Sequence, residues 1–353
     1  MHTTLSRNFG SDNVTPVCAP IMAAINAANT GLLPSYGADD FTERLQRAAS
    51  AVFEREVSIY PVATGTAANA LALAQLAPPF GGIYCHEGAH IVTDECGAPE
   101  LFTGGAKLLG LPSPNGKIGP EAIDASVALA NDMGVHHVKP SAISVTQATE
   151  LGTVYGLDEL GSLTAAARRH GLPVHMDGAR FANAVAHLGC SPAEATWKAG
   201  VDVLSFGASK NGALAAEAVV FFDPRRAEEF ERRRKRAGHL WSKLRYLSCQ
   251  LLAYLKDDLW LHNAHQANAM AARLARGLEK VSGAKLLQPV QANELFIAVP
   301  ERLIAALESA GFHFYRWPWL KVRDGAAIRL VTSYATSPAD VDDFVQAATR
   351  ASV

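Results

Sequence analysis

Residues 202–212 read DVLSFGASKNG, an apolar run that gives way to small residues around a single lysine, Lys210. The run predicts a buried β-strand from Asp202 to Phe206, because short apolar segments bounded by small residues are typical of strands covered on both faces. A lysine among small residues can enter a pocket and lose hydration, which lowers its pKa and makes its amine a usable nucleophile. The alternative is an ordinary loop lysine, as most lysines are.

A second apolar run that ends in charge lies upstream, where residues 173–180 read PVHMDGAR. We predict a strand from Pro173 to Met176 that ends at Asp177. A carboxylate and an amine at the ends of two strands are what a pyridoxal 5'-phosphate site needs, because the carboxylate keeps the pyridine nitrogen protonated. Asp177 could instead cap the next helix and pair with Arg180 at the surface, and these residues alone leave both interpretations open.

The pattern around these two runs predicts the fold class. Predicted helices and strands alternate from about residue 40 to residue 225, which indicates an α/β fold with a mostly parallel sheet covered by helices. The expected strands span 57–62, 83–85, 142–146, 173–176, 202–206 and 217–222, and the expected helices span 41–53, 66–76 and 157–170.

The pattern changes after Pro224. Residues 225–280 look almost continuously helical, with breaks near Gly238 and Asp257. Short strands and helices then mix at 284–289, 293–299, 301–310, 312–316, 328–332 and 338–349. We therefore expect residues 1–250 to form an N-terminal segment with a large cofactor-binding domain, and residues 251–353 to form a smaller C-terminal α+β domain.

Composition excludes several classes of protein. The net charge of −2 gives no global attraction to nucleic acid or to acidic membranes, so we expect neither as a partner. The first residues carry no apolar segment of the kind found in signal peptides. Five scattered cysteines without a Cys-x-x-Cys pair indicate reduced thiols in a cytoplasm. The basic run ERRRKR at 231–236 adjoins acidic residues, so it is interpreted as a solvated helix face or a subunit contact.

Residues 63–69 read ATGTAAN, which follows a predicted strand and opens a predicted helix. Small residues at a helix N-terminus let backbone N–H groups approach an anion, so Gly65 and Thr66 are candidate phosphate contacts. The competing interpretation is a plain helix cap made by Thr64 or Thr66.

Residues 85–96 read CHEGAHIVTDEC and bring Cys, His, Asp and Glu close together in the sequence. A metal site between Cys85 and Cys96 is therefore a competing hypothesis. Gly88 and Ala89 argue for a turn, however, so His86 and His90 need not share a helix face, and we predict no metal. One of these imidazoles could instead stack on a cofactor ring.

Residues 328–333 read IRLVTS and place Arg329 inside an apolar strand. A charge there is costly unless it is paired, and the carboxylate of an amino acid offers a planar, bidentate partner. An edge-strand arginine that faces solvent is the alternative.

Taken together, these motifs resemble the pyridoxal-phosphate-dependent L-threonine aldolases, in the β-eliminating-lyase branch of the aspartate-aminotransferase fold (fold type I). The resemblance runs over nearly the whole chain. It is carried by SDNVTP at 11–16, Tyr36-Gly37, TGTAAN at 64–69, His90, HMDGAR at 175–180, Ser209-Lys210 and RLVT at 329–332.

The resemblance implies a lyase that splits L-threonine, L-allo-threonine and related β-hydroxy-α-amino acids into glycine and an aldehyde. It implies that Lys210 binds the cofactor covalently, that Asp177 contacts its ring nitrogen, and that Gly65 and Thr66 bind its phosphate. His90 would stack on the ring, and it is the first candidate for the base.

The remaining implied contacts concern the substrate. Ser11, Arg180 and Arg329 would hold its carboxylate, with Arg180 also near the phenolic oxygen of the cofactor, and His136 would help to position the β-hydroxyl. A homo-oligomer, as a dimer of dimers, is implied as well.

The chain departs from many family members at SFGASKNG (205–212) and at RAGHLWSK (236–243), where it looks more like a bacterial subgroup that includes phenylserine aldolases. Another pyridoxal enzyme, either a β-eliminating lyase or an aminotransferase, is the nearest alternative. A metal-dependent enzyme using Cys85–Cys96 is the alternative from another class.

Overall fold

The computed structural model describes residues 7–352. Within this range, seven strands form the central sheet of the large domain in the spatial order β1-β7-β6-β5-β4-β2-β3. Their bounds are β1 Ser58–Val62, β2 Gly81–His86, β3 Lys107–Leu111, β4 Lys139–Thr146, β5 Val174–Gly178, β6 Val203–Gly207 and β7 Glu217–Phe221. β7 runs antiparallel to β1 and β6, and the other neighbours are parallel. The predicted mostly parallel sheet is confirmed.

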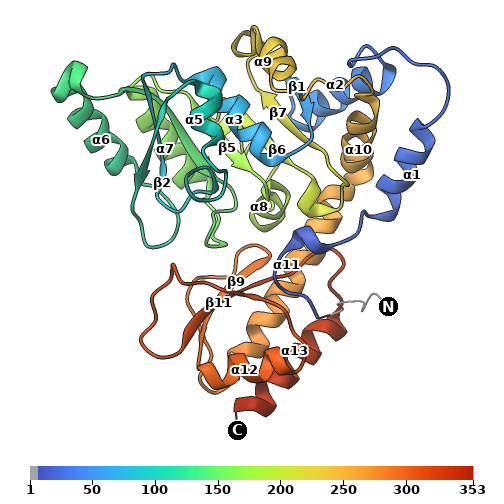
Figure 1. Ribbon diagram of the computed structural model, residues 1–353, viewed down its shortest axis with the longest axis vertical. Coiled ribbons are helices and arrows are strands. Elements are labelled where there is room, and N and C mark those ends of the chain that lie inside the picture. Colours follow the sequence, from blue (N-terminus) through green and yellow to red (C-terminus); the bar gives the residue numbers. More distant parts are fainter. Residues whose placement is uncertain (1–6, 353) are drawn as a thin grey trace.

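Helices cover both faces of this sheet (Figure 1). The helices before β5 are α1 Ala19–Ala28, α2 Asp40–Val52, α3 Gly65–Leu76, α4 His90–Thr93, α5 Ala98–Thr103, α6 Pro120–Met133 and α7 Leu157–Arg169. Those after β5 are α8 Phe181–Leu188, α9 Phe230–Arg236, α10 Arg245–Leu255 and α11 Leu259–Leu278.

The alanine-rich helix α3 is buried nearly all round. Its side chains pack in one cluster with Val203 of β6 and Val219 of β7. Alternate residues of the same strands, such as Leu204 and Val220, pack on the opposite face with α2, α7, α8 and α10. This alternation follows from the two-residue repeat of a strand, and it places Asp177 on the α3 side of the sheet.

The small domain is built on a second sheet. In the described part of the chain it has four antiparallel strands in the order β10-β11-β9-β8. Their bounds are β8 Lys285–Leu286, β9 Glu294–Val299, β10 Tyr315–Arg316 and β11 Ala326–Val331, and the helices α12 Glu301–Ser309 and α13 Pro338–Ser352 pack beside them. Figure 1 shows this domain below the large one, with α11 running between them.

Two segments connect the two cores. Helix α11 contributes Trp260 and Ala264 to the large core and Met270 to the small one. The N-terminal segment places Phe9 in the small core, 5.1 Å from Phe344 between ring centroids. The division at residue 250 therefore stays a prediction, because buried residues on both sides of it serve both cores.

The structure also shows elements that the sequence pattern does not predict, namely β3, α1, α4, α5, α6 and α8. The expected helical stretch at 225–280 is divided as foreseen: Gly238 has a φ of +77°, and Asp257 and Asp258 are left-handed at 51° and 54°. Among residues 7–352, no helix is both long enough and apolar enough to cross a lipid bilayer.

Candidate active site

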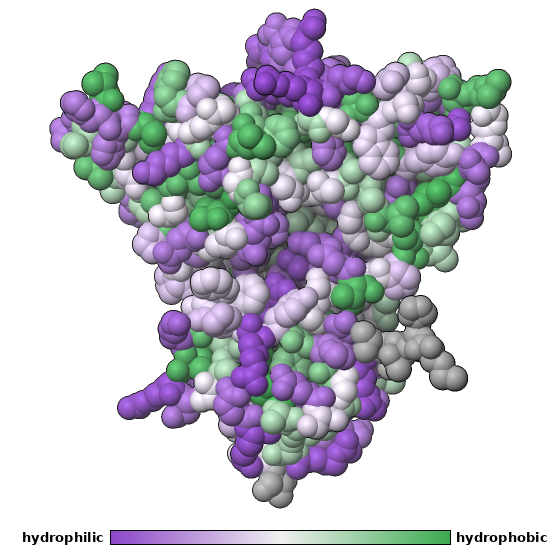
Figure 2. All heavy atoms as spheres, in the orientation of Figure 1, coloured by the Kyte–Doolittle hydropathy of each residue, from purple (hydrophilic) through white to green (hydrophobic). Residues whose placement is uncertain are grey.

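The carboxyl ends of β1, β2, β4, β5 and β6 all point to one edge of the large sheet, facing the small domain. Ligands of open α/β sheets bind at this edge. Gly65 and Thr66 follow β1, His90 follows β2, Asp177 lies near the end of β5 and Lys210 follows β6. The structure therefore brings these predicted residues to one place. On the face drawn in Figure 2, hydrophilic side chains gather around the waist between the two domains.

Lys210 lies half-buried in a short 3-10 turn, Ser209–Asn211. The buried carboxylate of Glu217 fixes the start of this turn, because its two oxygens accept the backbone N–H groups of Ala208 (3.0 Å) and Ser209 (3.2 Å). Asn211 fixes its end by donating to a backbone carbonyl and a tyrosine hydroxyl, both at 2.8 Å. The lysine is thus presented from a backbone that is held on both sides.

A chain of hydrogen bonds connects Asp177 to His90. The amide nitrogen of Asn69 lies 2.8 Å from Asp177 Oδ2 and 2.8 Å from Glu95 Oε1. The same Glu95 oxygen lies 2.9 Å from His90 Nδ1. The hydrogen bond to Glu95 raises the pKa of His90, although partial burial opposes the shift. Asn69 and Glu95 are site residues that were not predicted from the sequence, although both lie inside the motifs at 63–69 and 85–96.

These groups fit pyridoxal 5'-phosphate. Asp177 is 4% exposed, and its Oδ1 accepts the N–H of Ala179 at 3.0 Å, so each oxygen keeps lone-pair capacity for a further donor such as a ring N–H. Thr64 caps α3 by accepting the N–H of Ala67 at 3.2 Å. The N–H groups of Gly65 and Thr66 belong to the first turn, where a helix leaves its donors without intrahelical partners. A Cβ added to Gly65 would meet nothing within 4 Å, so there is room for a phosphate.

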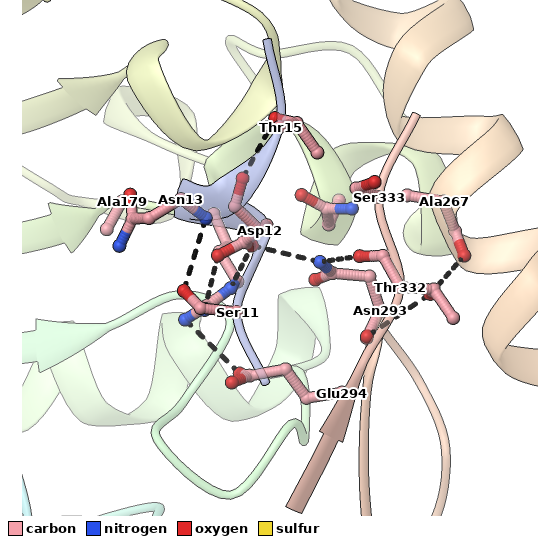
Figure 3. A network of polar contacts seen from close by, with 12 residues as sticks. Ser11, Asp12, Asn13, Thr15, Ala179, Ala267, Asn293, Glu294, Thr332 and Ser333 are labelled. Carbon is pink, nitrogen blue, oxygen red and sulfur yellow. Dashed lines mark hydrogen bonds and ion pairs between the residues drawn. The ribbon is translucent and has the colours of Figure 1, made fainter. Parts of the chain in front are cut away.

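Arg180 is buried and held by two carboxylates. Its Nε and Nη2 donate to the two oxygens of Asp12 at 2.8 and 3.0 Å, and its Nη1 lies 3.3 Å from Glu294 Oε2. Burial acts to raise the pKa of Asp12, but Arg180 and then Lys210 outweigh it, so the pKa is lowered. Figure 3 shows the two carboxylates, Asp12 from the N-terminal segment and Glu294 from β9.

Arg329 reaches the same place from β11. Its Nη1 lies 3.7 Å from Glu294 Oε1, and its Nη2 donates to the carbonyl oxygen of Gly10 at 3.2 Å. The guanidinium lies 4.6 Å from the ring centroid of Trp317 and 5.3 Å from that of Tyr315, so aromatic faces support it. Arg180 and Arg329 therefore converge on one shared carboxylate, Glu294.

Ser11 caps the short 3-10 helix Asp12–Val14, where its Oγ accepts the N–H of Asn13 at 3.1 Å. Its neighbours in sequence contact the two arginines: Asp12 accepts from Arg180, and the carbonyl of Gly10 accepts from Arg329. Asp12 and Glu294 are further site residues that were not predicted from the sequence. Glu294 could have been found in the way that Arg329 was, because each is a charged residue within a predicted apolar strand.

The structure does not bring His136 to this edge within the chain. His136 is exposed in the turn Gly134–His136, which precedes β4, whereas the site lies beyond the other end of that strand at Thr146. At the usual rise per residue of a strand, the length of β4 puts roughly 25 Å between them. His136 instead lines a recess with Tyr84 and Lys107.

In the Cys85–Cys96 segment, His90 and Glu95 belong to the site described above, whereas Cys85 and His86 make local structural contacts. Cys85 is buried, and the pKa of its thiol is raised to about 12 by burial. His86 accepts the N–H of Gly88 at 3.0 Å and lies 3.1 Å from a backbone oxygen. Across residues 7–352, no three His, Cys, Asp or Glu side chains gather as a metal-binding group.

These features define a class, and comparison with known proteins agrees: the chain belongs to the β-eliminating lyase family, which it matches over residues 8–301. It is 43% identical to a low specificity L-threonine aldolase of a Pseudomonas species, over 97% of each chain. It is 45% identical to that of Pseudomonas aeruginosa, over 89% of this chain and 90% of the relative.

Solved structures agree with the fold. A Leishmania major threonine aldolase superimposes with a TM-score of 0.92 at 27% identity, over 98% of this chain and 99% of the other. A Sphingomonas wittichii serine palmitoyltransferase gives 0.70 at 16% identity, over 98% and 86%, which supports the fold alone. The predicted fold type and the resemblance to threonine aldolases are confirmed.

Proposed function

We propose that this protein is a pyridoxal-phosphate-dependent aldehyde-lyase that cleaves L-threonine, L-allo-threonine and related β-hydroxy-α-amino acids into glycine and an aldehyde. The observation that carries the proposal is the meeting of Lys210, Asp177 and the N-terminus of α3 at one sheet edge, opposite two arginines from other parts of the fold. The relatives at 43% and 45% identity support it.

Different residues would hold different parts of the cofactor. Lys210 would attach it, Asp177 would accept its ring N–H, and the N–H groups of Gly65 and Thr66 would bind its phosphate. When bound, the cofactor supplies an acceptor for the electron pair left on Cα as the Cα–Cβ bond breaks. His90, one turn after β2, would cover the ring.

His90 is also the proposed base for the β-hydroxyl proton. Its Nδ1 is engaged with Glu95 at 2.9 Å, which leaves Nε2 to accept a proton directly or through one water. Glu95 can then stabilise the imidazolium that forms. Because the imidazole must be neutral to accept the proton, the activity should fall as pH drops through the pKa of His90.

Arg180, Arg329 and Ser11 are the proposed anchors of the substrate carboxylate. A carboxylate fixed at two points sets the rotation about the bond to Cα, and hence which bond is broken. Orientation of this kind can contribute several kcal/mol to a reaction barrier. We leave His136 outside this group, because it lies at the far end of β4.

The experiment is a product assay for glycine from L-threonine, L-allo-threonine and phenylserine, without an added keto acid. Release of glycine and an aldehyde is the expected result. A requirement for a keto acid would indicate an aminotransferase, and release of ammonia with a keto acid would indicate another β-eliminating lyase. The variant Lys210→Ala should lose the visible absorption band of the bound cofactor and the activity together.

Phenylserine belongs in this assay because of the departures at residues 205–212 and 236–243. We include phenylserine among the proposed substrates. A glycine yield from phenylserine far below that from L-threonine would contradict this part of the proposal.

We also propose a homo-oligomer, assembled as a dimer of dimers, that works in the cytoplasm. An exposed apolar surface supports association: Leu101 and Phe102 of α5 are 74% and 38% exposed beside Arg232 and Arg233 of α9. Light scattering of the purified protein tests the assembly, and a monomeric mass would contradict it.

A further inference from the structure

Glu294 is a buried carboxylate whose bonding is unusually poor. It is 1% exposed, and it lies between Arg180 Nη1, 3.3 Å from Oε2, and Arg329 Nη1, 3.7 Å from Oε1. Among the residues that the structure describes, neither of its oxygens accepts a hydrogen bond. Buried carboxylates normally have hydrogen-bond partners, so the lack of partners at Glu294 needs a physical reason.

Asp12, on the other side of Arg180, provides the contrast. It accepts two hydrogen bonds from Arg180 and a third from Asn293, at 3.0 Å. Asp12 is therefore a fixed partner of Arg180. Glu294 is attracted to two guanidinium groups but is well bonded to neither, which is the condition under which another carboxylate can replace it.

We propose that Glu294 is an exchangeable counter-ion: it takes the position of the substrate carboxylate between Arg180 and Arg329, and it gives up this position and binds a proton when an amino acid enters. The inference rests on the proposed function, in which these arginines anchor the substrate.

Charge balance explains why a proton is needed. Without substrate, the two arginines balance Asp12 and Glu294. A third carboxylate would leave a net negative charge in a buried place, where charge is costly. Glu150 makes the local potential more negative still. A proton on Glu294 restores neutrality, and its O–H can then donate to the incoming carboxylate.

The surroundings of Glu294 permit this proton. Burial raises its pKa, Arg180 and Arg329 oppose the shift, and Glu150 and Asp12 reinforce it. These four groups face it from the start of α8, from β11, from the loop after β4 and from the N-terminal segment. Lys210 acts on this cluster through Asp12. The site thus holds a carboxylate whose pKa is raised by burial, and a second carboxylate nearby would favour its protonation further.

The test is the binding of glycine to the holoenzyme, measured by titration calorimetry in two buffers of different ionisation enthalpy. The variant Glu294→Gln removes the competing charge, so its Kd for glycine should fall by about tenfold. Wild type should bind close to one proton more per glycine than this variant does. Proton release from the amine of glycine is common to both proteins and cancels in the comparison.

Two further variants make the result decisive. Glu294→Asp shortens the side chain and should also tighten glycine binding, by less than Glu294→Gln, so the prediction survives if the glutamine variant does not fold. Asp342→Asn breaks a surface pair with Arg273 that has two contacts at 2.8 and 2.7 Å, and it should leave both readouts unchanged.

Weaker glycine binding in both Glu294 variants, or an unchanged proton count, would overturn the inference and make Glu294 a fixed support of the arginines. Failure of the proposed function looks different. In that case wild type itself would neither bind glycine nor cleave L-threonine.

Discussion

The two sides of the active site hold their buried carboxylates in different ways. On the cofactor side, Asp177 accepts a neutral N–H group at each oxygen, and both donors belong to the large domain. On the substrate side, Asp12 and Glu294 face two arginines, and the four groups come from the N-terminal segment, β9, the start of α8 and β11. The cofactor side is therefore fixed within one core, whereas the substrate side depends on how the two domains dock.

The difference matters for catalysis, because the two sides serve different needs. A cofactor stays bound through many turnovers and benefits from a rigid frame of neutral hydrogen bonds. A substrate must enter and leave, and ion pairs that are not well bonded can be exchanged for others. Mutations on the two sides should consequently affect different kinetic constants.

The largest effect is expected from Asp177→Asn on the cofactor side. The amide cannot stabilise a protonated ring nitrogen, so kcat should fall by about 10²–10³-fold, as when a fixed electrostatic partner is lost from a reaction centre. The variant should still bind glycine. Steady-state kinetics with L-threonine measure the loss, and a drop of no more than a few-fold would remove Asp177 from its proposed role.

On the substrate side, Arg329→Lys keeps the charge but loses the planar fork and the stacking on Trp317. KM for L-threonine should rise by about tenfold, the size of one charge-assisted hydrogen bond, with a smaller change in kcat. Arg273→Lys at the surface is the matched control. If kcat fell and KM stayed constant, the result would contradict the assignment of Arg329 to substrate binding.

Glu95→Gln should change the pH profile more than the maximal rate. The hydrogen bond to Glu95 raises the pKa of His90, so its loss lowers that pKa. His90 must be neutral to act as a base, and the acidic limb of the kcat/KM profile should therefore move to lower pH. Glu159→Gln, a surface change that weakens a 2.7 Å pair with Lys117, should leave the profile in place. A limb that stayed fixed in Glu95→Gln would assign the ionisation to another group.

The smallest effect is expected from Asp342→Asn, which removes an exposed ion pair with Arg273. Exposed pairs contribute little because water screens them. Urea unfolding and L-threonine kinetics should both match wild type. A clear loss of activity would mean that the small domain transmits surface changes to the arginines.

Much of the cofactor side could be predicted from the sequence, because Gly65, Asp177 and Lys210 lie at or just after the end of a strand. The motifs around Lys210, Asp177 and Gly65 are local, and parallel strands bring their ends to one edge. On the substrate side, the arginines could be predicted but their carboxylate partners could not. Arg329 stands out as a charge in an apolar strand, but the partners of a buried ion are set by tertiary contacts.

Long-range pairs are what the sequence could not supply. Asp12 meets Arg180 across 168 positions and Asn69 meets Asp177 across 108, and no local pattern encodes either contact. The role of His136 stays a prediction, because a histidine close to a strand in sequence can lie at either end of it. The turn at Gly134–His136 enters β4, whereas the site follows it.

The pairing of Phe9 with the last strand has a consequence for synthesis on the ribosome. The N–H of Phe9 bonds to His313, and its carbonyl accepts the N–H of Val331 at 2.7 Å. The N-terminal segment is synthesised first, but it can pair with these residues only after nearly the whole chain has left the ribosome. The last strand of the large sheet ends at Phe221, so this sheet can assemble earlier. A nascent chain could therefore form its cofactor-binding residues well before its substrate-binding residues.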